Sequence, residues 1–170
     1  MALTLGLHAH EIRAGLKTFK GAYGRSELRV LPSGVRVLCD YYNANPTSIQ
    51  AALRVLEAQT PDPATRRRVC LGDMLELGPD EERYHRELAP FVLDQANRPG
   101  DQILLYGPRM KWLEQELKSS PKLLAQVRHF ETHAKLAEAL KVELKPADFV
   151  LIKGSRSMKM EGVWALLSTP

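Results

Sequence analysis

Cysteines and long apolar runs are scarce in this sequence of 170 residues, and both absences limit what it is. Its two cysteines, Cys39 and Cys70, cannot build a disulfide framework, and each lies in a short apolar run. We therefore expect buried core thiols in a reducing compartment. No segment approaches the ~18 apolar residues of a membrane span, and the N-terminus lacks the basic flank of a signal peptide. A cytoplasmic protein is expected.

Several motifs that carry chemistry are also missing. The sequence has neither the G-x-x-x-x-G-K-[ST] phosphate loop nor the G-x-G-x-x-G dinucleotide fingerprint. No cluster of acids or histidines has metal-ligand spacing, and no Ser/His/Asp arrangement can be singled out. We therefore expect no metal site and no complete catalytic centre within this chain.

Positive charge is only slightly in excess. The net charge of +4 comes from 24 Lys and Arg against 20 Asp and Glu, and the single dense basic run is Arg66–Arg68. This run precedes the apolar segment Val69–Leu71, so we interpret it as the solvated start of a strand. A nucleic-acid-binding protein is expected to show a basic stripe with interleaved aromatic residues, and none is visible. Nucleic acid is therefore not an expected partner.

Short apolar segments alternate with amphipathic segments along the chain. We expect strands over residues 28–31, 35–39, 69–71, 103–106, 127–130 and 149–152. We expect helices around Ile12, Leu16 and Phe19, over 46–59 and 79–96, and over 110–117, 136–144 and 160–167. The turn residues between the first two strands predict a hairpin. Wholly apolar strands between amphipathic helices predict a three-layer α/β domain, mostly parallel, with one antiparallel strand.

The segment Asp40–Pro46 lies between an expected strand and an expected helix, where open α/β sheets bind their ligands. Asn45 and Pro46 are well explained as the N-cap and first residue of the helix. Asp40, Tyr42 and Asn43 are not explained in this way. A carboxylate at a strand end can accept hydrogen bonds from ribose hydroxyls, and a Tyr ring can lie against a base. The segment therefore predicts a ligand site.

Further candidate site residues follow the next expected strand. In the loop Gly72–Gly78, Asp73 and Glu76 are candidates, whereas the acids of the next turn, 80–82, are expected only to complement a helix dipole. His85 either caps this loop or contacts a ligand, and both alternatives stay open.

The third candidate segment follows the most apolar strand. Lys153, Ser155 and Arg156 together form an anion-binding set for a carboxylate or phosphate. The alternative is a turn at the start of a helix that carries surface charges.

These three loops, D-Y-Y-N-A-N-P, L-G-D-M-L-E-L-G and K-G-S-R-S-M-K-M-E, resemble the C-terminal domain of Mur ligases, most of all the MurF type. Gly24-Arg25 is similar to the junction between the family's central and C-terminal domains. The resemblance implies that residues 1–24 are the last helix and linker of the central domain. It also implies that residues 25–170 are the C-terminal domain, with a Rossmann-like sheet.

The resemblance implies ATP-dependent amide formation, in which D-alanyl-D-alanine is added to UDP-N-acetylmuramoyl-tripeptide for peptidoglycan. The residues that would contact the nucleotide are Arg25, Asp40, Tyr42 and Asn43. Those that would help place the substrates are Asp73, His85, Lys153, Ser155 and Arg156. The sequence departs from the family's usual Asp-Asp-Ser-Tyr-Asn-Ala-Asn-Pro, because Cys39 replaces the first Asp and Tyr41 replaces the Ser.

The family's phosphate loop, magnesium ligands and UDP-sugar domain have no counterpart in this sequence. ATP and Mg²⁺ are thus expected cofactors of a larger enzyme, with the metal held elsewhere, and the chain alone is expected to be inactive. Met1 falls inside what resembles a central-domain helix, which favours an excised fragment. Two alternatives stay open: a related ligase with a different amine substrate, and a stand-alone module that binds a nucleotide or peptide without catalysis.

Overall fold

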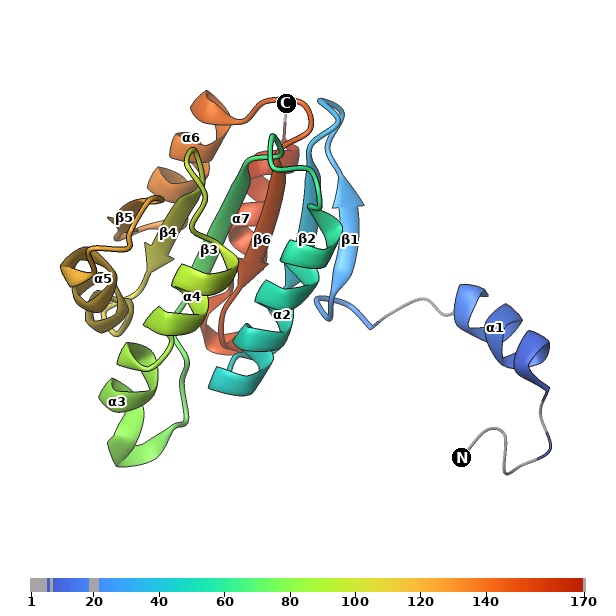
Figure 1. Ribbon diagram of the computed structural model, residues 1–170, viewed down its shortest axis with the longest axis horizontal. Helices are drawn as coiled ribbons and strands as arrows, with labels where there is room; N and C mark the ends of the chain where they lie inside the picture. The colour runs from blue at the N-terminus through green and yellow to red at the C-terminus, as the bar shows by residue number, and fades with distance from the viewer. Residues whose placement is uncertain (1–5, 7, 19–21, 170) are drawn as a thin grey trace.

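A computed structural model describes residue 6 and the ranges 8–18 and 22–169. Figure 1 shows one twisted sheet with helices in front of it and behind it. The sheet has six strands in the order β1-β2-β6-β3-β4-β5, and the β1–β2 pair is antiparallel whereas the others are parallel. The predicted three-layer α/β fold, mostly parallel with one antiparallel strand, is confirmed.

The elements follow the predicted order. The strands are β1 (Glu27–Val30), β2 (Arg36–Asp40), β3 (Arg67–Gly72), β4 (Gln102–Tyr106), β5 (Gln126–Phe130) and β6 (Phe149–Lys153). The helices are α1 (Ala9–Thr18), α2 (Pro46–Gln59), α3 (Glu81–Arg86), α4 (Ala89–Gln95), α5 (Met110–Ser119), α6 (His133–Glu143) and α7 (Glu161–Ser168). The described residues also include two short 3₁₀ turns, η2 (Gly78–Asp80) and η3 (Arg156–Met158).

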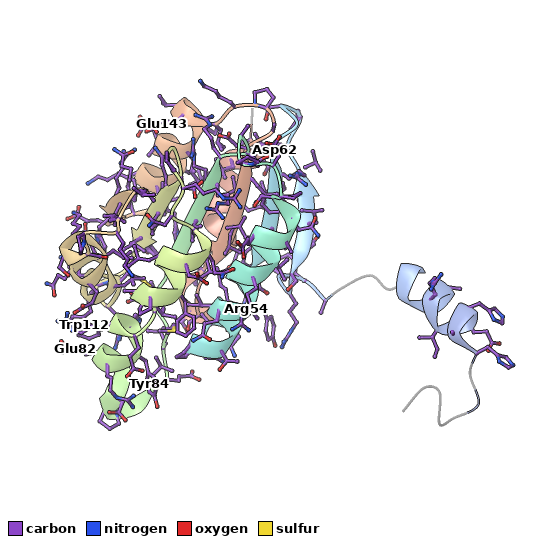
Figure 2. The ribbon with its side chains drawn as sticks, viewed as in Figure 1. Arg54, Asp62, Glu82, Tyr84, Trp112 and Glu143 are labelled. Atoms are coloured by element: carbon purple, nitrogen blue, oxygen red, sulfur yellow. The ribbon has the colours of Figure 1, made fainter. Side chains whose placement is uncertain are left out.

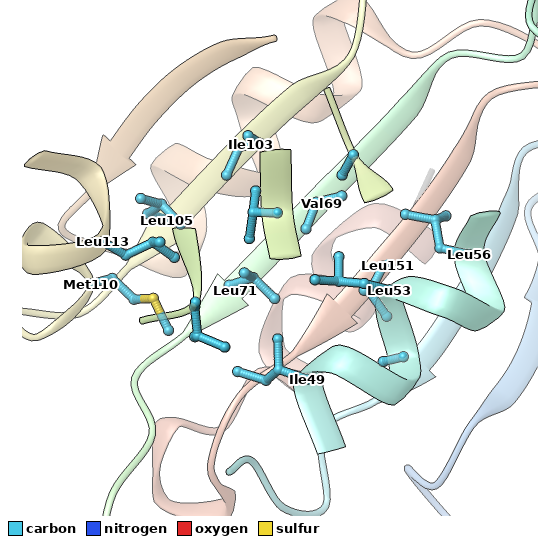
Figure 3. Packing of buried hydrophobic residues seen from close by; sticks show 14 of the residues in the cluster. Ile49, Leu53, Leu56, Val69, Leu71, Ile103, Leu105, Met110, Leu113 and Leu151 are labelled. Carbon is cyan, nitrogen blue, oxygen red and sulfur yellow. The ribbon is translucent and has the colours of Figure 1, made fainter. Parts of the chain in front are cut away.

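The inner strands β3, β4 and β6 are largely apolar and buried because both faces of the sheet are covered there. Successive strand residues point to opposite faces, so Val69 and Leu71 pack with α2, α4 and α5, whereas Cys70 packs with α6 and α7. Figure 3 shows the first of these two clusters, with Ile49 and Leu53 of α2 reaching toward the sheet. Both cysteines are buried free thiols, as expected.

The first helix lies apart from the sheet (Figure 1). Its expected apolar face was Ile12, Leu16 and Phe19, and of these Phe19 and the side chain of Leu16 lie outside what the structure describes. Ile12 is partly buried. The linker that follows turns at Gly24, which has φ +66°, before the chain enters β1.

One expected helix, over residues 79–96, is wrong as a single element. The structure has η2, α3 and α4 in its place, with the break between Arg86 and Ala89. Pro90 lies in the first turn of α4. A proline lacks the backbone N–H that a continuous helix requires, and its ring clashes with the carbonyl four residues earlier, here that of Arg86. The apolar periodicity continued through this point, so the proline decided the boundary.

The interpretation of Arg66–Arg68 as a solvated strand start is also wrong. The side chains of Arg67 and Arg68 are each only 2% exposed. Arg67 pairs with the buried carboxylate of Asp101, and Arg68 pairs with that of Asp148. These acids immediately precede β4 and β6, the two neighbours of β3. Burial of a guanidinium is tolerated because a partner carboxylate lies at the same end of the sheet. The basic run is therefore a structural ion-pair network.

Candidate functional site

Three of the loops singled out by the sequence meet at one edge of the sheet. The strand β6 lies between β2 and β3, so that Lys153 is in register with both Asp40 and Leu71. Parallel strands end at the same edge, and the loops after β2, β3 and β6 are therefore neighbours although they are far apart in the sequence. Fold topology, more than any local motif, assembles this site.

The loop after β2 forms one side of a pocket of about 380 Å³. All four residues predicted for the nucleotide, Arg25, Asp40, Tyr42 and Asn43, line this pocket. Lys153 lines it as well, and the middle of α2 contributes apolar side chains. The volume lies within the ~300–1,000 Å³ of pockets that hold drug-sized ligands.

The deepest charged contact of this pocket joins Lys153 and Asp40. The ammonium group of Lys153 donates to Oδ2 of Asp40 at 2.6 Å and to the carbonyl oxygen of Asn43 at 2.8 Å. Burial lowers the pKa of Lys153, and the contact with Asp40 opposes that shift. Oδ1 of Asp40 accepts the backbone N–H of Ser26 at 2.9 Å. Lys153, expected to help place the substrate, therefore lies with the nucleotide set.

Arg25 and Tyr42 form the exposed rim of the same pocket. The guanidinium of Arg25 lies 4.0 Å from the centre of the Tyr42 ring, and the Tyr42 side chain is 44% exposed. The backbone N–H of Tyr42 donates to the carbonyl oxygen of Gly24 at 2.9 Å, which anchors the preceding turn to this loop. A cation stacked on an aromatic ring presents both a flat apolar surface and a positive charge to a ligand.

The predicted cap of α2 is confirmed. Oδ1 of Asn45 accepts the backbone N–H of Ser48 at 2.8 Å, Oγ of Ser48 accepts the backbone N–H of Asn45 at 3.0 Å, and Pro46 opens the helix. Both Asn45 and Ser48 also line the pocket, so the helix begins at its edge. The positive end of a helix dipole favours an anionic ligand there.

Asp73 is buried behind the second loop. Its carboxylate accepts the backbone N–H groups of Arg109 at 3.3 Å and Met110 at 2.9 Å, at the start of α5. Burial raises the pKa of Asp73, and these two hydrogen bonds partly offset that effect. Asp73 therefore holds the β4–α5 loop against the β3 loop.

Arg109 is a residue of this site that the sequence analysis missed. Its Nε donates to Glu81 at 2.6 Å, and its Nη1 lies 3.8 Å from Asp73. The interpretation of Glu81 as a helix-dipole partner only was therefore incomplete. The sequence could have pointed to Arg109, because it is a cation shortly after the apolar strand β4. The same reasoning singled out Lys153.

Ser155 connects all three loops. Its Oγ accepts the backbone N–H of Leu75 at 2.8 Å and donates to the carbonyl oxygen of Ala44 at 3.3 Å. Its backbone N–H donates to the carbonyl oxygen of Asp73 at 3.0 Å. The side chain is nearly buried. The geometry therefore gives Ser155 a positioning role among the loops.

His85 is fully buried, and both of its ring nitrogens have partners. Nε2 accepts the backbone N–H of Met74 at 3.1 Å, and Nδ1 lies 2.6 Å from the carbonyl oxygen of Glu81, which assigns the proton to Nδ1. Burial lowers the pKa of His85. Trp112 packs edge-on against the ring, and Figure 2 shows Trp112 beside α3. Of the two alternatives for His85, this geometry favours the cap of the loop.

The other candidates lie at the surface of the site. Arg156 is exposed and pairs with Glu161 at 2.9 Å. Glu76 is exposed and has φ +63°, a conformation unusual for a residue with a side chain. Neither side chain reaches the pocket that Lys153 lines.

No group of three or more His, Cys, Asp or Glu side chains within residues 8–18 and 22–169 is placed to hold a metal ion. No helix in that part of the chain has the length and apolar character needed to cross a membrane.

Comparisons with known proteins agree with this arrangement. Residues 24–156 match the family model described as "Mur ligase, glutamate ligase domain". The UDP-N-acetylmuramoyl-tripeptide–D-alanyl-D-alanine ligase of Bacillus subtilis is 32% identical over 159 residues, covering 93% of this chain and 33% of that protein. The structure of MurF from Acinetobacter baumannii has a TM-score of 0.76 at 28% identity, covering 98% of this chain and 35% of that one.

A MurF ligase from Thermotoga maritima, solved in complex with ADP, has a TM-score of 0.75 at 24% identity and supports the fold alone. The match covers 98% of this chain and 35% of the Thermotoga maritima protein. This chain therefore spans about a third of the length of the relatives it matches.

Proposed function

This chain belongs to the Mur ligase family, and we propose that it is the C-terminal domain of a MurF-type, ATP-dependent ligase. In that role it clamps nucleotide and substrate while D-alanyl-D-alanine is added to UDP-N-acetylmuramoyl-tripeptide. Residues 1–24 then belong to the preceding domain, and residues 25–170 form the clamping domain. The missing domains are the partners of this chain.

One observation carries the nucleotide part of the proposal. The residues assigned to the nucleotide on sequence grounds all line one pocket, together with Lys153 and the start of α2. A cation stacked on Tyr42, a carboxylate at a strand end and a helix N-terminus suit the phosphates, the ribose and the base of a nucleotide. The Mg²⁺ that phosphoryl transfer needs would be held by residues outside this chain.

The substrate part rests on the loops after β3, β4 and β6. Arg156 and Arg109 place guanidinium groups near the surface of this edge, each paired with a glutamate that an anionic ligand would have to displace. Asp73, His85 and Ser155 hold the loops in place. An acyl phosphate and an incoming dipeptide carboxylate are both anionic, and guanidinium groups suit both. Closure of this domain over the central domain would complete the site, so the isolated chain should not turn over.

The nucleotide part can be tested with the full-length protein by measuring ATP affinity in Arg25→Ala and Tyr42→Ala variants. We expect weaker ATP binding in both variants. Tyr84→Ala is the matched control, because Tyr84 also carries a stacked arginine but lies on α3, outside the pocket lining (Figure 2). Unchanged ATP affinity in the two pocket variants would contradict the nucleotide assignment.

The amine substrate is tested by assaying the full-length protein with ATP, UDP-N-acetylmuramoyl-tripeptide and a panel of amine acceptors. Preference for D-alanyl-D-alanine supports the proposal. Preference for a single amino acid would favour the related-ligase alternative, and nucleotide binding without any turnover would favour a binding module.

A further inference from the structure

A second pocket, of about 250 Å³, lies at the same edge of the sheet but between β4 and β5. The chain leaves β4 toward α5, which packs on one face of the sheet, and leaves β5 toward α6, which packs on the other face. A crevice opens where neighbouring strands send their connections to opposite faces, and such crevices are preferred ligand sites in open α/β sheets. None of its lining residues belongs to the nucleotide pocket.

The lining of this β4–β5 pocket combines an apolar floor with a polar rim. The apolar side chains are Tyr106, Phe130 and Met158, and the polar ones are Lys111, His129 and Glu131. Pockets with mostly apolar linings and few polar groups are typical of small-molecule sites, where the polar groups fix the orientation of the ligand.

The walls of this pocket are held by hydrogen bonds. Nε2 of His129 lies 2.7 Å from the carbonyl oxygen of Gly107, which joins the end of β5 to the loop after β4. Nε2 of His133 lies 2.9 Å from the carbonyl oxygen of Met158, and the centres of the His133 and Tyr106 rings are 4.4 Å apart. The pocket is thus preformed, and a ligand would bind without paying for loop ordering.

The rim carries more positive than negative charge. Within the described part of the chain, the Lys111 side chain has no hydrogen bond or ion pair, although its charge acts on the neighbouring Glu131, which pairs directly with Lys135 at 3.1 Å. Because one carboxylate faces two lysines here, the net charge next to the apolar floor is positive. A ligand that complements both features has an anionic group and an apolar body.

We propose that the β4–β5 pocket binds a small apolar carboxylate, with its carboxylate on Lys111 and its apolar body on Phe130, Tyr106 and Met158. The volume is below the ~300 Å³ at which drug-sized pockets begin, so the body is limited to about one ring or a short branched chain. A nucleotide is too large for this pocket. The inference stands independently of the proposed ligase function, because it uses no residue of the nucleotide pocket.

The experiment is a titration of the ¹⁵N-labelled chain with phenylacetate, followed in ¹H–¹⁵N correlation spectra. We expect saturable shifts at the amides of Gly107, Lys111 and Phe130. Lys111→Glu should weaken binding by ~10-fold or more, because it removes a charge-assisted hydrogen bond to the carboxylate and adds charge repulsion. Lys122→Glu is the matched control, because Lys122 is exposed and lies outside the pocket.

The charge-reversed probe 2-phenylethylamine has a similar apolar body and should bind much more weakly than phenylacetate. If Lys111→Glu alters the spectrum of the free protein, Lys111→Met replaces it and should still weaken binding. The absence of saturable shifts at the pocket, equal affinity for both probes, or full affinity in a Lys111 variant would overturn the proposal. ATP added to the same sample should shift the Tyr42 loop instead, so failure of one site does not depend on the other.

Discussion

The buried ammonium of Lys153 donates to Oδ2 of Asp40 at 2.6 Å, and this contact joins the carboxyl ends of β6 and β2. The Lys153 side chain is 2% exposed and that of Asp40 is 15% exposed. A residue pair 113 positions apart in the sequence is thus the charged centre of the pocket that Arg25 and Tyr42 also line. The pair both stabilises the domain and places two polar groups for a ligand.

Replacing Asp40 should destabilise the domain as well as alter the site. Asp40→Asn leaves the Lys153 ammonium buried without its counter-charge. We expect a loss of about 3 kcal/mol in the free energy of unfolding, near the lower end for a broken buried pair, because Asp40 keeps some exposure. Urea unfolding measures this. The double variant Asp40→Asn/Lys153→Met removes the unpaired charge and should recover most of the loss; an equally unstable double variant would contradict the explanation.

Removing the Ser155 hydroxyl should loosen the contact between loops. Ser155→Ala leaves the backbone N–H of Leu75 without its acceptor, and we expect a loss of about 1–3 kcal/mol in the free energy of unfolding. The amide of Leu75 should exchange faster with deuterium. Ser157→Ala, two residues later and exposed, is the control and should change neither quantity. Equal protection of Leu75 in Ser155→Ala would show that the hydroxyl does not hold the loop.

Gly24 should tolerate no side chain, for two separate reasons. It has φ +66°, and a Cβ there would lie 2.8 Å from ring carbons of Tyr41. Gly34 has φ +87° but open space around a Cβ, so Gly34→Ala measures backbone strain alone, about 1–2 kcal/mol. We expect Gly24→Ala to lose clearly more stability than Gly34→Ala in parallel thermal melts.

The steric part of the Gly24 prediction can be isolated with a double-mutant cycle. Because Tyr41→Ser removes the ring that a Cβ at position 24 would meet, it should reduce the cost of Gly24→Ala. Additive effects of the two substitutions would mean that the ring contact does not matter.

The buried His85 should make the folded domain less stable in mild acid. Burial lowers its pKa below the ordinary value of 6.5, so below that pH the unfolded chain binds a proton that the folded chain does not. This contribution is fully present above pH 6.5 and is lost as the pH falls toward the pKa of the folded state. Urea midpoints at pH 7.5 and 5.5 should differ more for the parent chain than for His85→Gln. His10→Gln on the exposed helix α1 serves as control, and a pH dependence that is unchanged in His85→Gln would refute this cause.

Features governed by near neighbours were predicted well. The α2 cap is an example, because Asn45, Pro46 and Ser48 meet within one turn. Asp40, Tyr42 and Asn43 were singled out from their place after an apolar strand, and Arg25 from the family resemblance. All four line one pocket, and their role toward a nucleotide stays a prediction. The helix break at Pro90 was missed although the proline was visible, because the apolar periodicity on both sides of it was given more weight.

Features governed by distant contacts were not predicted. The Arg66–Arg68 run gave no sign of burial, since Asp101 and Asp148 lie far away in sequence and meet it only when β3 lies between β4 and β6. Arg109 was missed for the same reason, because its partners Glu81 and Asp73 come from other connections.

The sequence by itself determined the α/β alternation, the start of α2 and the polar loops at strand ends, since periodicity and capping are short-range effects. Only the tertiary structure decided that β6 lies between β2 and β3, and hence that Lys153 meets Asp40 and Ser155 joins three loops. It alone decided that β4 and β5 send their helices to opposite faces, which opens the second pocket. Strand order is set by how the whole set of apolar faces packs together, and no local segment encodes it.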